Sequence, residues 1–307
     1  MWRQISAVPC FWAFSLAFRQ ARTSADLSIL ARYTLEEMRK QGSMRMDVAF
    51  FDIDNTLTWR DPKTGWGNEA TPASKDAIRR FSELGNVALL STGRAPQGVP
   101  QCLQGLPFRG MLCFDGALAL LDGKRVSAHF IPAQDLEEAL AEAYRAHMGI
   151  LFSGPEGRAF AGERRGFEWH ATQVESLEDL KRVLPSLEVG KLAFRYFDLP
   201  RYKESSFFQT HFACYQSAPD YFELVCPGVG KDVAAHELVR ALEEEGGTVG
   251  RTLAFGDSEN DIPLLRAADI AVAMGNASPA AKEAASYVTD DVHHDGVAHA
   301  LAHLGYI

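Results

Sequence analysis

Short apolar runs alternate with amphipathic segments along the first third of the chain. Val48–Phe51, Val87–Leu90 and Met111–Phe114 have the length and composition typical of strands that are buried on both faces of a sheet. Between the first two runs, Pro72–Leu84 places apolar residues one helical turn apart and is followed by Gly85, which predicts a helix and its end. Strand, helix and strand in this order predict a doubly wound parallel sheet of the α/β class.

The same pattern returns from residue 231 to the C-terminus. Asp232–Glu245, which two glycines follow, predicts a helix, and Thr252–Phe255 and Ile270–Met274 predict strands. Shorter helices are predicted over 262–267, 277–286 and 297–304. We expect this segment to complete the sheet that the first third of the chain begins.

The middle of the chain has a different pattern. Leu118–Leu121 and Arg125–Phe130 flank Asp122-Gly123, which predicts an antiparallel hairpin. Farther along, helices are expected over 133–147 and 177–184, a loop over 154–166, and strands over 192–197, 212–216 and 221–225. This mixed order predicts an inserted α+β domain of residues 117–226, within an α/β core formed by residues 44–116 and 227–307.

The status of residues 1–43 is open. Ile5–Phe18 resembles the short apolar core of a signal peptide, but Pro9 and Cys10 interrupt it and no clear cleavage site follows. Met44 and Met46 lie immediately before the first predicted strand. We therefore favour the other interpretation, in which this segment is a misassigned start or an appended tail.

Composition excludes several classes of function. The net charge of −9 over 307 residues argues against a nucleic-acid partner or a polybasic membrane surface, and no run is long enough to span a bilayer. The five cysteines are scattered and form no Cys-x-x-Cys pair, which predicts free thiols in a reducing compartment rather than disulfides or a zinc site. We expect a cytoplasmic protein.

Polar residues follow the predicted strands at their carboxyl ends. In open α/β sheets, ligands bind at this edge, so side chains that follow neighbouring parallel strands are expected to converge there. The residues concerned are Asp52 and Asp54 after the first strand, Thr92 after the second, Lys231 at the start of a helix, and Asp257, Asn260 and Asp261 after a later strand.

These residue types fit phosphoryl transfer. Two neighbouring carboxylates repel each other unless they share a cation or a proton, and a site of carboxylate and carbonyl oxygens suits Mg²⁺. A carboxylate can also attack phosphorus and form an aspartyl-phosphate. A lysine and a hydroxyl can hold the phosphate oxygens and balance their charge.

The chain resembles the haloacid dehalogenase superfamily in four motifs that occur in the family's order. More narrowly, it resembles the Cof-like, type IIB phosphatases, which carry an α+β cap domain between the second and third motifs. The resemblance covers Asp47 to the C-terminus. Its motifs are Asp52-x-Asp54-x-Thr56, Thr92-Gly93-Arg94, Lys231, and Gly256-Asp257-x-x-Asn260-Asp261.

The resemblance implies a role for each motif residue. Asp52 would be the nucleophile, and Asp54 would protonate the leaving oxygen and later deprotonate a water molecule. The Asp52 carboxylate, the Asp54 carbonyl and Asp257 would hold Mg²⁺. The remaining roles are phosphate binding by Thr92, Gly93 and Lys231, with Asn260 nearby, and the orientation of Lys231 or a metal-bound water by Asp261.

The chain departs from the family at one position. Asp115-Gly116 follows the third strand, where the family commonly has Asn-Gly. Either dipeptide suits a tight turn, but an acid here would disfavour an anionic group of the substrate. Arg158, Arg164 and Arg165, in the inserted domain, fit either contact with an anionic substrate or a solvated loop.

The sequence therefore predicts a Mg²⁺-dependent phosphatase that acts on a small phosphorylated metabolite through an aspartyl-phosphate. Sugar phosphates, nucleotides and phosphorylated cofactors all fit as substrates. Two alternatives stay open, namely phosphotransfer to a second metabolite and a non-catalytic protein that binds phosphometabolites.

Overall fold

The computed structural model describes residues 45–60, 68–168 and 170–307. The predictions made for residues 1–43 lie outside this range. None of the helices in the described residues is long and apolar enough to cross a membrane.

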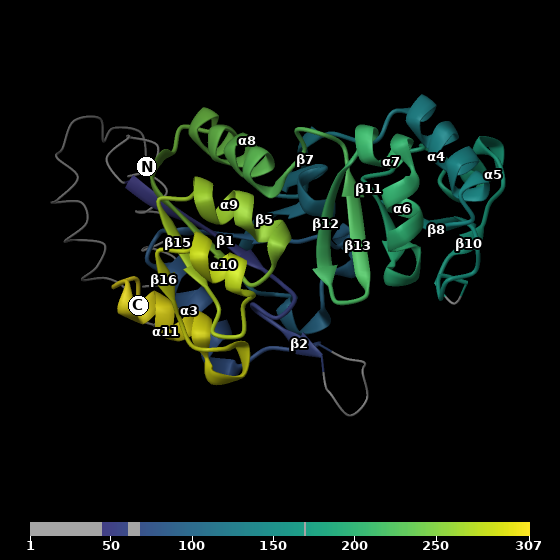
Figure 1. Ribbon diagram of the computed structural model, residues 1–307. Coiled ribbons are helices and arrows are strands. Elements are labelled where there is room, and N and C mark those ends of the chain that lie inside the picture. The colour runs from purple at the N-terminus through teal and green to yellow at the C-terminus, as the bar shows by residue number, and fades with distance from the viewer. Residues whose placement is uncertain (1–44, 61–67, 169) are drawn as a thin grey trace, which may run out of the picture.

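The larger of two main sheets has the strand order β16-β15-β14-β1-β4-β5-β6-β7 (Figure 1). The strands from β16 to β5 run parallel to their neighbours, and the β6–β7 hairpin is antiparallel at one edge. The predicted doubly wound α/β core is confirmed. Its strands are β1 (Arg45–Asp52), β4 (Val87–Ser91), β5 (Phe108–Cys113), β6 (Leu118–Leu121), β7 (Lys124–Ala128), β14 (Thr248–Gly256), β15 (Ile270–Ala273) and β16 (Tyr287–Val288).

Helices cover both faces of this sheet. One group pairs α3 (Pro72–Glu83) with α11 (Gly296–His303). The other consists of α8 (Lys231–Glu244), α9 (Ile262–Ala267) and α10 (Pro279–Ala284), and it lies on the opposite side in Figure 1.

The start of α3 illustrates how the sequence sets a helix boundary. The Thr71 side chain accepts a hydrogen bond from the Ser74 backbone N–H, and Pro72 occupies the first turn, where its missing N–H has no intrahelical partner to lose. The buried face of the helix includes Ile78 and Phe81.

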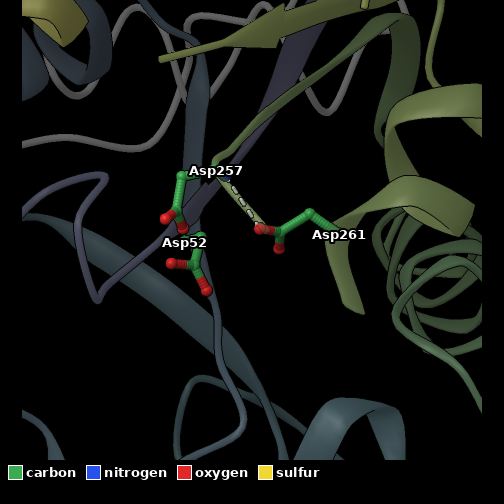
Figure 2. Close-up of side chains that lie close together, drawn as sticks. All are labelled: Asp52, Asp257 and Asp261. Carbon is green, nitrogen blue, oxygen red and sulfur yellow. Dashed lines mark hydrogen bonds between the residues drawn. The ribbon is translucent and has the colours of Figure 1, made fainter. Parts of the chain in front are cut away.

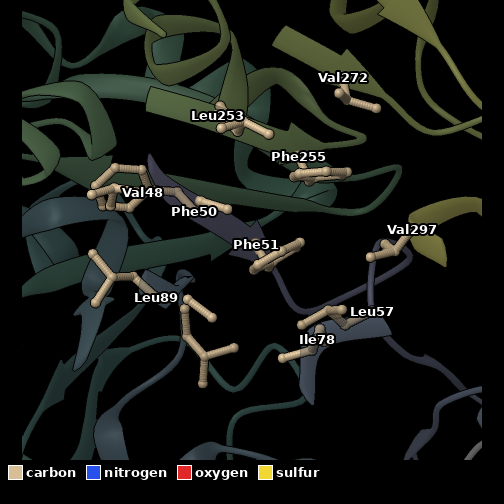
Figure 3. Close-up of a cluster of buried hydrophobic side chains, with 14 of the residues drawn as sticks. Val48, Phe50, Phe51, Leu57, Ile78, Leu89, Leu253, Phe255, Val272 and Val297 are labelled. Atoms are coloured by element: carbon tan, nitrogen blue, oxygen red, sulfur yellow. The ribbon is translucent and has the colours of Figure 1, made fainter. Parts of the chain in front are cut away.

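Aliphatic side chains and a few aromatic ones fill the core between the sheet and its helices (Figure 3). Phe51 stacks on Phe255 of the neighbouring strand at 4.7 Å between ring centroids, and it meets Phe81 edge-on. Each fully buried side chain of this size contributes about 1.5–3 kcal/mol. This packing fixes the relative positions of β1 and β14, whose ends carry most of the candidate site.

The second sheet has the order β10-β9-β8-β11-β13-β12, and its helices lie on the side away from the core (Figure 1). We call this unit the cap. Its elements are α4 (Ala133–Arg145), β8 (Gly149–Gly154), β9 (Gly157–Gly162), β10 (Thr172–Gln173), α5 (Leu177–Val183), β11 (Lys191–Arg195), α6 (Leu199–Glu204), α7 (Ser206–His211), β12 (Ala213–Ala218) and β13 (Tyr221–Val225). A small separate ladder pairs β2 (Trp59–Arg60) with β3 (Asn68–Glu69).

Two expectations for the middle of the chain need correction. The segment 154–166 was expected to be a loop, but β9 lies within it and pairs with β8, which was not predicted. Its glycines and arginines hide the strand pattern, and pairing with β8 overrides local propensity. The predicted hairpin 118–130 does form, but it extends the larger sheet. We therefore propose that the cap begins after Ala128 rather than at residue 117.

Candidate active site

The carboxyl ends of three adjacent parallel strands bring the predicted polar residues together. β1 lies between β14 and β4, and the register pairs Asp52 with Ser91. Asp52 therefore lies beside Thr92, which follows β4, and Asp257, which follows β14. Asp52, Thr92 and Asp257 are all buried.

Lys231 connects two of these strand ends. Its side chain is fully buried, and its Nζ donates hydrogen bonds to Asp52 Oδ1 at 2.8 Å and to Asp261 Oδ1 at 2.6 Å. Burial alone would lower the pKa of Lys231, but Asp261 and Asp52 outweigh it and raise that pKa well above its ordinary value. The lysine is therefore charged and faces two carboxylates.

Asp261 shapes the loop that follows β14. Its Oδ2 accepts hydrogen bonds from the backbone N–H groups of Asp257 and Ser258 at 3.0 and 3.1 Å. A Cβ at Gly256 would lie 2.5 Å from Asp261, so the loop needs glycine at that position. Since both oxygens of Asp261 are engaged, its carboxylate positions Lys231 and the loop.

Asp52, Asp257 and Asp261 form a compact acidic group (Figure 2). One oxygen from each lies within 4.8 Å of the other two. Burial, opposed by Lys231, raises the pKa of Asp52 well above its usual range, and burial together with Asp261 raises the pKa of Asp257 to about 7. Three buried carboxylates facing one ammonium leave excess negative charge, which fits a divalent cation. Asp52 and Asp257 are the better placed ligands, because Asp261 is already engaged.

Asp54 pairs with Arg94 in the described conformation. Both of its oxygens accept hydrogen bonds from the guanidinium, at 2.7 Å from Nε and 2.6 Å from Nη2. Arg94 also donates to the Gly98 carbonyl and to Asn68. Asp54 can therefore give a proton to a leaving group only after this pair opens.

Thr92, Gly93 and Asn260 surround the same strand ends. The Thr92 hydroxyl accepts a hydrogen bond from the Arg94 backbone N–H at 3.1 Å, so it lies within the turn after β4. The Asn260 amide donates to Asp115 Oδ1 at 2.8 Å. Asn260 thus joins the cluster through Asp115, which the sequence marked only as a departure from the family pattern.

Three functional candidates escaped the sequence analysis. Arg94 lay inside a quoted motif and received no role. Lys191 and Glu223, from the cap, meet Asp115 in a buried group, and no local pattern marks either residue, because the contacts join distant segments. In contrast, Arg164 and Arg165 line a separate pocket together with Arg195 and Phe197. None of the residues predicted to bind phosphate or metal lines this pocket.

A family model described as haloacid dehalogenase-like hydrolase matches residues 49–301. The chain belongs to this family, as the motif resemblance indicated, and it is a hydrolase of the phosphatase type.

Relatives and solved structures agree with this assignment. The pyridoxal phosphate phosphatase YbhA of Escherichia coli is 27% identical over 281 residues, which cover 83% of this chain and 97% of that protein. BT1666 of Bacteroides thetaiotaomicron, a phosphatase of the superfamily, superimposes with a TM-score of 0.73 at 26% identity and covers 87% of this chain and 98% of its own. BT4131, described as a sugar phosphatase of subclass IIB, gives a TM-score of 0.70 at 22% identity, with 85% and 100% covered. The last comparison concerns the fold alone, and it agrees with the predicted type IIB arrangement.

Proposed function

We propose that this protein is a Mg²⁺-dependent phosphatase that hydrolyses a small phosphorylated metabolite through an aspartyl-phosphate on Asp52. The observation that carries the proposal is the position of the Lys231 ammonium, which is buried between Asp52 and Asp261. This arrangement keeps one carboxylate next to a fixed positive charge at the edge of the sheet where ligands bind.

The first chemical step uses the free oxygen of Asp52. Lys231 holds Oδ1, so Oδ2 attacks phosphorus, the Asp52–phosphorus bond forms and the ester bond breaks. Asp54, released from Arg94 and carrying a proton, transfers that proton to the leaving oxygen. In the second step Asp54 takes a proton from water, water oxygen attacks phosphorus, and the Asp52–phosphorus bond breaks to release phosphate.

The other residues hold the phosphoryl group and the metal. Lys231, Thr92 and the Gly93 backbone bind the phosphate oxygens, with Asn260 beside them. Asp52, Asp257 and the Asp54 carbonyl would hold Mg²⁺, which would neutralise charge on the transferring group. The acidic group described above fits this ion, because its carboxylate oxygens converge and outnumber the single lysine.

The substrate class stays broad. YbhA acts on pyridoxal phosphate by its name, and we extend to this chain only the general class, a small phosphorylated metabolite. Enclosure by the cap is consistent with a small substrate, because the cap strand β12 packs against Glu259–Asp261.

The test is phosphate release from p-nitrophenyl phosphate with Mg²⁺ or with chelator. We expect activity only with Mg²⁺, and a loss of about 10³-fold or more in Asp52→Asn. Asp76→Asn changes an exposed aspartate of α3 and should keep full activity. Acid quenching with labelled substrate should leave label on the wild-type protein and none on Asp52→Asn.

Other outcomes separate the alternatives. Unchanged activity in Asp52→Asn would refute the nucleophile. Bound substrate without turnover in the wild type would point to a binding protein, and transfer of label to an added alcohol in preference to water would point to a phosphotransferase.

A further inference from the structure

Asp115, Lys191 and Glu223 form a buried charged group where the cap meets the core. These three residues are 2%, 6% and 5% exposed, respectively. Lys191 Nζ donates a hydrogen bond to Asp115 Oδ2 at 3.2 Å and another to Glu223 Oε1. Burying charges is costly unless they are paired, and this group lies outside the set of residues assigned to phosphoryl transfer.

The group adjoins the phosphate-binding turn. A Cβ built on Gly93 would lie 2.8 Å from Lys191 Nζ and 3.0 Å from both oxygens of Asp115. Asp115 also accepts the hydrogen bond from Asn260. A phosphomonoester held at Gly93 would therefore place the first atoms of its alcohol part near Lys191 and Asp115, with Glu223 bound to the same lysine.

The cap sheet presents two members of the group from one face. Ala193 of β11 pairs with Glu223 of β13, and Lys191 lies two residues before Ala193, so Lys191 and Glu223 point the same way. The helices of the cap pack on the other face. Lys191 and Glu223 therefore lie on the face of the cap sheet that is turned toward the core.

The group has unused hydrogen-bonding capacity. Glu223 Oε2 is buried and has no hydrogen-bond partner among the residues that the structure describes. An ammonium has three donors, and the described residues accept two from Lys191, through Asp115 and Glu223. This group, which adjoins Gly93, therefore has one donor and one acceptor unfilled. A buried polar atom without a partner costs about 1–3 kcal/mol.

We propose that Lys191 and Glu223 recognise a hydroxyl group on the substrate's alcohol part, next to the carbon that carries the phosphoester. The hydroxyl accepts from Lys191 and donates to Glu223 Oε2. Two carboxylates around one lysine disfavour a second anionic group, and an amine would place a second ammonium against Lys191. This inference rests on the proposed phosphatase function and adds a specificity determinant to it.

The test compares two substrates that differ in one hydroxyl, propane-1,2-diol 1-phosphate and n-propyl phosphate, at pH 8 with Mg²⁺. We expect wild-type kcat/KM to favour the diol by about 10-fold or more. Glu223→Gln keeps the size of the side chain and the bond to Lys191 but removes the open acceptor, so the preference should fall below about 3-fold.

Glu142→Gln is the matched control, because Glu142 is a buried cap glutamate on α4, on the far side of the cap sheet, and accepts a hydrogen bond from Ser205. Its preference should equal that of the wild type. Glu223→Asp, which withdraws the carboxylate by one carbon, should lose the preference as Glu223→Gln does, and it decides the matter if Glu223→Gln does not fold.

Two results would overturn the inference. One is a wild-type protein that hydrolyses both substrates equally well, and the other is equal loss on both substrates in the Glu223 variants. Either can occur while p-nitrophenyl phosphate is still hydrolysed in an Asp52-dependent way, so the inference can fail without the proposed function.

Discussion

Lys231 is the residue on which the candidate site depends most. Its ammonium is the nearest positive charge to Asp52 and Asp261 among the described residues, and it is buried with them. Attraction to both acids outweighs the cost of burial, which is why the pKa of Lys231 rises rather than falls. The same contact leaves Asp52 Oδ2 free for attack on phosphorus.

Lys231→Met should therefore damage both stability and activity. Removing one partner of a buried charge pair typically costs about 3–5 kcal/mol, because the carboxylates left behind are buried without a counterion. We expect a loss of this size in urea unfolding at pH 8 with chelator, together with loss of phosphatase activity. Lys124→Met, at an exposed position, should leave both unchanged. An unaltered unfolding midpoint in Lys231→Met would contradict this account.

At the same scale, Asp257 gives a test of metal binding that does not need turnover. A cation that binds only the folded state adds about 3 kcal/mol at 100 times its Kd. We expect Mg²⁺ to raise the Tm of the wild type by about 5–10 °C for a chain of this size. Asp257→Asn should lose most of this shift, and Asp76→Asn should keep it. Equal shifts in Asp257→Asn and the wild type would exclude Asp257 as a ligand.

At the scale of elements, local patterns predicted the strands and helices that hold the motifs. β1, β4 and the second half of β14, from Leu253 to Gly256, are buried and mainly apolar, and a buried strand is readable from a short apolar run that ends in polar residues. α3 was readable from the spacing of its apolar residues and from Gly85, which follows it. For these elements, local preference and tertiary packing favour the same structure.

The elements whose position was predicted wrongly depend on pairing between segments that are far apart in the sequence. A hairpin such as β6–β7 can join the edge of either sheet, and its position is decided by β5, whose Gly110 lies too close to Leu120 to tolerate a side chain. Asp115 likewise meets Lys191 and Glu223 from across the chain. No window of neighbouring residues contains this information. The acid at position 115, which was expected to disfavour an anionic group of the substrate, forms an ion pair with Lys191 of the cap.

The buried position of Glu223 on β13 also predicts a pH dependence of the free energy of unfolding. Burial and the neighbouring Asp115 raise the pKa of Glu223 from 4.5 to about 7. Between these values the folded protein binds more protons than the unfolded chain, so the contribution of Glu223 is complete below pH 4.5 and is lost progressively as the pH rises from 4.5 to 7. The loss is roughly 3 kcal/mol in total.

Urea unfolding of wild type and Glu223→Gln from pH 5 to 8, with Mg²⁺ present, measures this contribution. The wild type should lose stability more steeply than the variant between pH 5 and 7, and the difference between the two curves should level off above pH 7. Parallel curves would show that Glu223 does not titrate in this range.

At the scale of the whole molecule, the proposed function requires the cap to sit closely on the core. Lys191 pairs with Asp115 across this boundary, and the Gln97 side chain donates to the Pro155 carbonyl of the cap at 2.8 Å. The two domains also pack closely at Gly190, just before β11, where Phe114 of the core fills the space that a side chain would need. Segments of the cap and of the core thus make contact beside the residues proposed to bind phosphate.

Gly190→Ala should separate the two domains slightly without unfolding either one. The added Cβ would lie 2.6–2.8 Å from carbon atoms of Phe114, so the cap must move outward by a fraction of an ångström or more. Displacements of about 1 Å can cost about 10²-fold in rate, and we expect kcat/KM to fall by at least about 10-fold. Gly98→Ala is the control, because its Cβ would meet Arg94 at an ordinary 3.5 Å. If Gly190→Ala kept full activity on a small phosphomonoester, close contact between cap and core would not be required for catalysis.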